Sequence, residues 1–259
     1  MRKQHLLYLL GAGAPRLTSA LAAVGALRYA PRAYRSHSCL HFCTSCFPAL
    51  PNTFTATRGV RCLFPFPPLL VYLQGGDGTR AASPSYPRMI AEEQEFVCVI
   101  LPLFKRSVDP ADPANTPPPM IIRDADGKSA GPLYKEMLRR LEETVPNLDP
   151  HRRILGGFSN GAHMTGELID QSEGETAGQF SAFFLVEGGG RMRRYDLLKG
   201  KPLLLMYGSP KALNRIQQMH DSATAAGAKV PLHEMKGVGH AFPSEQFPAV
   251  REWLRANAQ

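Results

Sequence analysis

Residues 153–164 read RILGGFSNGAHM, and this stretch decides the fold. Its first half is an apolar run of the kind that forms a buried strand. Its second half, from Asn160 onward, follows a helical pattern. Ser159 stands at the junction with a glycine two residues away on each side. Small residues there let the backbone turn sharply from a strand into a helix.

The same alternation of apolar runs and helical patterns extends on both sides of this stretch. Short apolar runs predict buried strands at 69–73, 96–104, 152–158, 180–190, 202–208 and 230–235. Helical patterns lie at 86–94, 131–145, 160–169, 213–227 and 243–256, with Pro132 suited to the first position of its helix. Strands that alternate with helices predict an α/β protein with a mainly parallel sheet covered by helices on both faces. In such a protein the chemistry lies at the carboxyl ends of the strands.

Gly157, Phe158, Ser159, Asn160 and Gly161 match the G-x-S-x-G pattern of a nucleophile elbow. The pattern predicts that Ser159 is exposed at the top of the sheet as a nucleophile. It also predicts that the backbone N–H of Asn160 points to where an oxyanion would form. The alternative is a plain turn between a strand and a helix. The strand before the motif and the helix after it favour the elbow.

A serine nucleophile needs a base, and His240 is the best candidate. It lies in GVGHAFP (237–243), after the last predicted strand and before the last helix, whereas the other histidines of the body lie in helices or at strand starts. The loop VYLQGGDG (71–78) follows the first strand, and Gly75 and Gly76 are candidates for a second oxyanion donor, Gly76 above all. The alternatives are a structural role for His240 and a simple glycine turn at 75–76.

Three segments in this order, LLVYLQGGDG (69–78), GFSNGAHM (157–164) and GVGHAFP (237–243), resemble the α/β-hydrolases. The resemblance covers about residues 67–258. It is nearest to the polyhydroxybutyrate-depolymerase and feruloyl-esterase branch, where a serine-asparagine-glycine elbow is common. It implies a serine hydrolase that cleaves small-molecule carboxylic esters through an acyl-enzyme, with Ser159 and His240 as catalytic residues. It implies no metal and no organic cofactor.

The chain departs from the family pattern where the triad acid usually stands. The loop after the strand at 202–208 places Lys211 about where an aspartate is expected. Glu187, which ends the preceding strand, is the best substitute, because some members of the family place their acid there; otherwise it caps a glycine turn. Glu234 is a weaker candidate, since it lies within the final predicted strand. Gln74 also replaces the histidine that the family usually has before the glycines.

The family also has two strands before the one at 69–73, and no convincing pair precedes it here. Segments 53–59 (TFTATRG) and 60–66 (VRCLFPF) are the candidates. We therefore expect an α/β-hydrolase sheet that is short of its first strands. Together, these departures suggest an alternative function. The chain would then be a catalytically impaired α/β-hydrolase-fold protein that acts as a binding or interaction module.

Charge divides the chain into a leader, 1–66, and a body, 67–259. The stretch before Asp77 contains eight Lys and Arg residues and no Asp or Glu. The remaining 22 Lys and Arg residues follow it and balance all 22 Asp and Glu residues of the chain. A neutral body argues against a nucleic-acid partner. The acid-free leader suggests export or organelle targeting, a poorly ordered segment or a wrong start. It is too interrupted for a membrane span. The oligomeric state is not indicated.

Four of the five cysteines lie in the leader, and only Cys98 lies in the body, so disulfides do not organise this fold. Within the leader, a zinc site is an alternative for the histidines and cysteines of HSCLHFCTSC (37–46).

Overall fold

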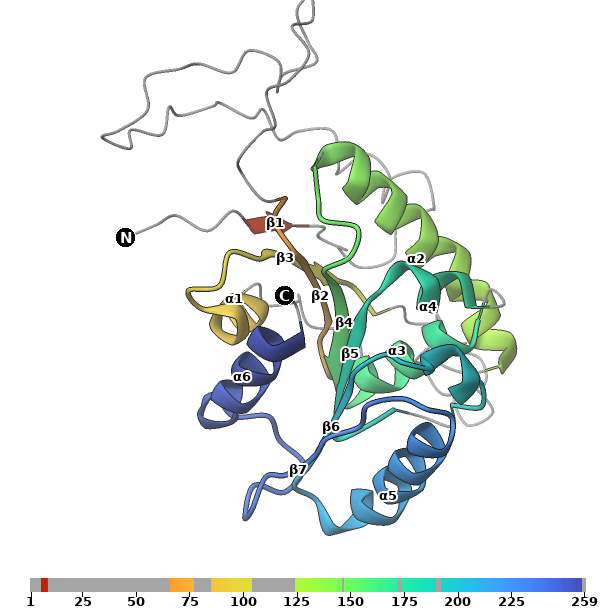
Figure 1. Cartoon of the computed structure of the whole chain (residues 1–259), viewed down its shortest axis with the longest axis vertical. Coiled ribbons are helices and arrows are strands. Elements are labelled where there is room, and N and C mark those ends of the chain that lie inside the picture. The colour runs from red at the N-terminus through yellow and green to blue at the C-terminus, as the bar shows by residue number, and fades with distance from the viewer. Residues whose placement is uncertain are drawn as a thin grey trace, which may run out of the picture.

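The computed structural model describes residues 6–8, 66–76, 85–103, 124–145, 147–171, 174–189 and 192–257. Within these residues, seven strands form one sheet in the order β1-β3-β2-β4-β5-β6-β7, and all neighbouring pairs are parallel (Figure 1). The strands are β1 (Leu6–Tyr8), β2 (Leu69–Leu73), β3 (Val97–Leu101), β4 (Arg153–Phe158), β5 (Ala182–Val186), β6 (Leu203–Tyr207) and β7 (Leu232–Glu234). The helices are α1 (Ser85–Ala91), α2 (Asp124–Thr144), α3 (Asn160–Asp170), α4 (Glu175–Gln179), α5 (Pro210–Ala225) and α6 (Phe247–Asn257). This arrangement confirms the predicted parallel sheet covered by helices.

The continuous apolar runs form strands because the sheet is buried on both faces. Every residue of β2 is buried. Successive side chains of a strand point to opposite faces, so Leu69, Val71 and Leu73 join one core cluster and Leu70 and Tyr72 join the other. A strand covered on both faces therefore needs no polar alternation, which is why its sequence reads as one apolar run.

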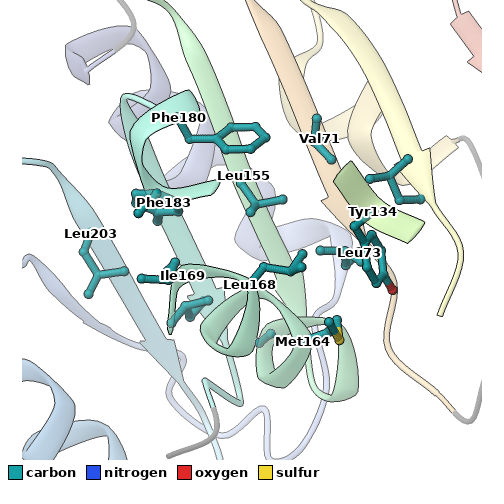
Figure 2. Close-up of a cluster of buried hydrophobic side chains, with 14 of the residues drawn as sticks. Val71, Leu73, Tyr134, Leu155, Met164, Leu168, Ile169, Phe180, Phe183 and Leu203 are labelled. Atoms are coloured by element: carbon teal, nitrogen blue, oxygen red, sulfur yellow. The ribbon is translucent and has the colours of Figure 1, made fainter. Parts of the chain in front are cut away.

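Helices cover the two faces unequally. Helices α2, α3, α4 and α5 lie on one face, and α1 and α6 lie on the other (Figure 1). Figure 2 shows the larger cluster, in which Leu155 of β4 and Phe183 of β5 lie near Leu168 of α3. At the far side of this cluster the hydroxyl of Tyr134 donates a hydrogen bond of 2.7 Å to the carbonyl of Pro102. This bond ties α2 to the end of β3.

The prediction for the start of α2 was wrong. The helix begins at Asp124 rather than at Gly131, and Pro132 lies inside it rather than at its first position. Proline has no N–H to donate to the carbonyl four residues earlier, so this helix lacks one internal hydrogen bond. Ala130, two residues before the proline, is fully buried in the larger cluster. Helix propensities describe single residues and do not include such tertiary packing, so they do not predict this earlier start of the helix.

The leader contributes one short element to the described structure. Leu6–Tyr8 form β1, which pairs in parallel with β3 at the edge of the sheet. Segment 53–59 and residues 60–65, the proposed early strands, lie outside the described residues, as do residues 37–46 with the proposed zinc ligands. The division into leader and body stays a prediction. Among the described helices, none is both long and apolar enough to cross a membrane.

Candidate active site

The turn between β4 and α3 holds Ser159 in a backbone conformation that L-residues rarely adopt. Its φ is 53° and its ψ is −119°, so the surrounding structure must compensate for the strain. The flanking glycines make the turn possible. A Cβ added to Gly157 would lie 2.5 Å from the carbonyl carbon of Gly161, and one added to Gly161 would overlap the carbonyl oxygen of Leu73. The small residues of the G-x-S-x-G motif are therefore required by close backbone contacts.

The structure brings Ser159 and His240 together across 81 residues of sequence. His240 lies in the loop between β7 and α6, and its Nε2 is 2.9 Å from Oγ of Ser159. Its other ring nitrogen, Nδ1, is 2.9 Å from Oε2 of Glu187. The imidazole side chain is 57% exposed, whereas the side chain of Glu187 is fully buried. A hydroxyl, an imidazole and a carboxylate thus form one hydrogen-bonded chain that runs from the surface into the protein.

Glu187 follows β5 directly and has a φ of 53°, in the left-handed region. Its side chain extends toward the loop after the neighbouring strand, β6. There its Oε1 accepts hydrogen bonds from the backbone N–H groups of Gly208 and Ser209, the latter at 2.8 Å. Hydrogen bonds from backbone amides satisfy the buried carboxylate. Glu187 therefore follows β5 in the chain, while the backbone groups that bind its carboxylate follow β6.

The other residues considered for the acid position lie elsewhere. Lys211 is exposed in the first turn of α5, and Glu234 is exposed at the end of β7. Gln74 is half-buried, and its carbonyl oxygen lies close to Gly161 at the start of α3. Of the two glutamates proposed from sequence, Glu187 is the one that contacts His240.

The glycine loop after β2 lies against the turn that holds Ser159. The side-chain amide of Asn160 donates a hydrogen bond of 2.7 Å to the carbonyl oxygen of Gly76. As the first residue of α3, Asn160 also has a backbone N–H without an acceptor inside the helix. Gly76, exposed with a φ of 107°, ends this described part of the loop. The two proposed oxyanion donors thus belong to neighbouring segments, and their role in binding an oxyanion stays a prediction.

Sequence reasoning missed three features of this site. Phe158 lies beside the imidazole of His240, with ring centroids 5.5 Å apart and planes inclined at 34°. Gly208 and Ser209 bind Glu187 through their backbone N–H groups. Because almost any residue has such a group, the sequence does not reveal this contact. The side chain of Asn160 contacts the glycine loop, although the motif drew attention only to its N–H. Of these three features, only the place of Phe158 could have been inferred from the sequence, because this residue directly precedes Ser159.

No protein-family model matches the chain, and no curated protein matches its sequence. Solved structures do resemble it. Esterase PE8 is 20% identical, with 74% of this chain and 94% of that one covered and a TM-score of 0.55. SOBER1 from Arabidopsis thaliana is 12% identical, with 74% and 99% covered and a TM-score of 0.53. A carboxylesterase from Mesorhizobium loti is 16% identical, with 73% and 88% covered and a TM-score of 0.52.

These identities are low, so the likeness concerns the fold. Two of these three structures are named as an esterase and a carboxylesterase, and the matched structures have the α/β-hydrolase fold. The parallel sheet, its helices on both faces and the strained turn after β4 agree with that architecture. The chain has the α/β-hydrolase fold, which confirms the predicted fold class.

Proposed function

We propose that this protein is a serine hydrolase that cleaves carboxylic esters through an acyl-enzyme intermediate. The observation that carries the proposal is the hydrogen-bonded chain from Ser159 through His240 to Glu187, with both contacts at 2.9 Å. A nucleophile, a base within hydrogen-bond reach and a third group that orients the base are the three parts that such catalysis needs. They lie at the carboxyl ends of β4, β5 and β7, where α/β proteins bind their substrates.

In the first half of the reaction, Oγ of Ser159 attacks the carbonyl carbon of the ester as Nε2 of His240 takes its proton. Glu187 accepts a hydrogen bond from Nδ1–H, which keeps Nε2 free as the base and stabilises the imidazolium that forms. The carbonyl oxygen becomes negative and is bound by the N–H groups of Asn160 and Gly76. His240 then returns the proton to the leaving alcohol, and Ser159 remains acylated.

In the second half, water takes the place of the serine hydroxyl. His240 accepts a proton from the water as its oxygen attacks the acyl carbon. Collapse of the second tetrahedral species releases the carboxylic acid, and the proton passes from His240 to Oγ of Ser159. The exposure of the imidazole gives water direct access to the base. The residues return to their starting state, so this cycle needs no cofactor.

Structural likeness supports an ester as the substrate. The similar structures include an esterase and carboxylesterases from Mesorhizobium loti and Bacillus cereus. Within this fold, the serine-asparagine-glycine elbow at 159–161 favours the polyhydroxybutyrate-depolymerase and feruloyl-esterase branch. The hydrogen bond between Glu187 and His240 favours an enzyme over a catalytically impaired module, because it provides the carboxylate that Lys211 does not.

A fluorophosphonate probe and a p-nitrophenyl ester test the proposal. The probe is expected to label the full chain at Ser159, and the ester to be hydrolysed with a burst of p-nitrophenol if deacylation is slow. Both signals should disappear in Ser159→Ala. A well-folded wild-type chain that neither takes the label nor releases p-nitrophenol would contradict the proposal and favour the binding module.

A further inference from the structure

The side chain of Asn160 connects the turn that holds Ser159 to the glycine loop after β2. Its Nδ2 donates to the carbonyl oxygen of Gly76 at 2.7 Å, across 84 residues of sequence. The backbone N–H of the same residue begins α3 and is the first proposed oxyanion donor. One residue therefore belongs to the first donor and also touches the residue that carries the second.

The glycine loop needs such a contact because the described residues do not pack around Gly76. Gly76 is exposed, and a Cβ built on it would meet no atom of the described part of the chain within 4 Å. Its φ of 107° belongs to the range that glycine adopts freely. The hydrogen bond from Asn160 fixes the carbonyl of Gly76, which belongs to the peptide after this residue. The N–H of Gly76 belongs to the peptide before it, and that peptide is then held between this bond and the end of β2.

The loop is already fixed at its other end, where β2 finishes. Gly161 lies so close to this segment that an added Cβ would overlap the carbonyl oxygen of Leu73 and lie 2.9 Å from that of Gln74. Leu73 and Gln74 are thus held against the start of α3 by backbone contact. The hydrogen bond from Asn160 attaches the loop to the same helix at a second point, Gly76, which lies three residues after Leu73. The loop therefore has a fixed position relative to Ser159 at both points.

We infer that the side chain of Asn160 is a positioning residue that sets the second oxyanion donor before substrate binds. This inference rests on the proposed esterase function. Preformed donors stabilise the charge that develops on the carbonyl oxygen without reorganising at the moment of reaction. Because that charge is largest in the transition state, losing the orientation lowers kcat more than it raises KM. Asn160 acts here through Gly76, in addition to its own N–H.

Two substitutions test the role of the side chain while keeping the backbone N–H of residue 160. Asn160→Ala removes the donor, and Asn160→Asp keeps the shape but places an acceptor against the carbonyl of Gly76. We expect Asn160→Ala to lower kcat for a p-nitrophenyl ester by roughly 10- to 100-fold, with KM changed less than about threefold. We expect Asn160→Asp to be at least as impaired. The pH at which activity is half-maximal should not move in Asn160→Ala, because His240 and Glu187 are untouched.

A trifluoromethyl ketone inhibitor gives a readout that a merely structural role would not move. It forms a tetrahedral adduct with the serine and carries a negative oxygen, so its affinity should fall by about the same factor as kcat/KM. Asn257→Ala is the matched control. Its Nδ2 also donates to a backbone carbonyl, that of Trp253 at 2.8 Å, but at the end of α6. That variant is expected to keep both kcat and inhibitor affinity.

The outcomes separate this inference from the proposed function. If Asn160→Ala keeps wild-type kcat and inhibitor affinity while Ser159→Ala is inactive, the positioning role is wrong and the esterase function stands. A loss of kcat in Asn160→Ala without any loss of inhibitor affinity would also overturn the role. If the wild-type chain itself has no esterase activity and takes no fluorophosphonate label, the proposed function fails first.

Discussion

The carboxylate of Glu187 accepts a hydrogen bond of 2.8 Å from the backbone N–H of Ser209, and this contact joins the end of β5 to the loop after β6. The N–H of Gly208 donates to the same oxygen, Oε1. The second oxygen, Oε2, is thereby directed to Nδ1 of His240 at 2.9 Å. Two backbone donors thus determine which carboxylate oxygen faces the imidazole. The buried side chain has little freedom to turn.

This arrangement predicts a large effect of Glu187→Gln. The amide oxygen of glutamine takes the place of Oε1 between the two backbone N–H groups, so its NH₂ group faces His240. That group donates to Nδ1, and the ring proton moves to Nε2, which can no longer accept the proton of Ser159. We expect kcat for a p-nitrophenyl ester to fall by about a thousandfold or more, since the corresponding Asp→Asn change in a serine protease lowers kcat by about 10⁴ through the wrong tautomer.

Glu234→Gln is the matched control for Glu187→Gln. Glu234 is exposed at the end of β7, so its charge is not held by a buried site. We expect its kcat to stay within about twofold of wild type, as for most exposed surface substitutions. Circular dichroism should show that both variants are folded. Equal losses of activity in the two variants would exclude Glu187 as the residue that orients His240.

A second prediction concerns the close contact between α3 and β2. In Gly161→Ala the new methyl group would overlap the carbonyl oxygen of Leu73, a backbone atom that cannot turn away. We expect this variant to lose about 2 kcal/mol or more of unfolding free energy, together with esterase activity. Urea denaturation followed by tryptophan fluorescence measures the loss, because Trp253 is the only tryptophan of the chain.

Gly178→Ala supplies the contrast. Gly178 lies in α4, and a Cβ built on it would meet none of the described atoms within 4 Å. Alanine is favoured over glycine in a helix by up to about 1 kcal/mol, so this variant should be as stable as wild type or slightly more stable. A Gly161→Ala protein with the same urea midpoint as Gly178→Ala would show that the helix moves away from β2 at little cost.

The fold was predictable from the sequence for a simple physical reason. Strands buried on both faces contain few polar residues, so β2 and β5 read as uninterrupted apolar runs. The beginning of α2 was not predictable in the same way. Pro132 is a good first residue of a helix, yet it lies in the interior, two residues after Ala130, which is buried against the core.

The candidate site likewise has residues that the sequence predicts and contacts that it does not. Ser159 and His240 lie within two residues of glycines after predicted strands, which is a pattern visible in the sequence. The preference for Glu187 over Glu234 came from their positions at a strand end and within a strand and from the family resemblance, whereas the contact with His240 is visible only in space. The donors at Gly208 and Ser209 are backbone groups that nearly every residue possesses. Their contribution becomes visible only when β5 and β6 lie side by side.

A third prediction concerns the ring of Phe158, which lies beside the imidazole of His240. Its centroid lies 5.5 Å from that of His240 and 6.2 Å from that of Phe242. The imidazole is largely exposed, and this ring packs beside it. In Phe158→Ala we expect kcat to fall by roughly tenfold through a less well aligned base, with KM little changed.

A remote aromatic substitution separates alignment from stability. Phe180 is buried and packs against Phe183 at a centroid distance of 6.2 Å, in the cluster under α3. Phe180→Leu should lower the melting temperature and leave kcat of the folded protein nearly unchanged. If Phe158→Ala keeps wild-type kcat at a temperature where it is folded, His240 is aligned by Ser159 and Glu187 alone.

The final prediction uses the buried thiol of Cys98 in β3. Burial raises the pKa of this thiol to about 12, and the charge of Arg88 opposes the rise only in part. In the unfolded chain the same thiol ionises near its ordinary pKa of 9.0. The folded state therefore holds the proton more tightly than the unfolded state. Its contribution to stability is complete below about pH 9 and is lost as the pH rises toward 12.

Two measurements check this behaviour. With Cys39, Cys43, Cys46 and Cys62 replaced by serine, Cys98 is the only thiol, and a disulfide reagent should react with it in urea but not in the native protein. In the same background, raising the pH from about 8 to about 10 should lower the unfolding free energy more than it does in a further Cys98→Ala variant. Rapid labelling of the native thiol, or equal pH dependence in the two proteins, would mean that β3 opens readily and that Cys98 is not held in the core.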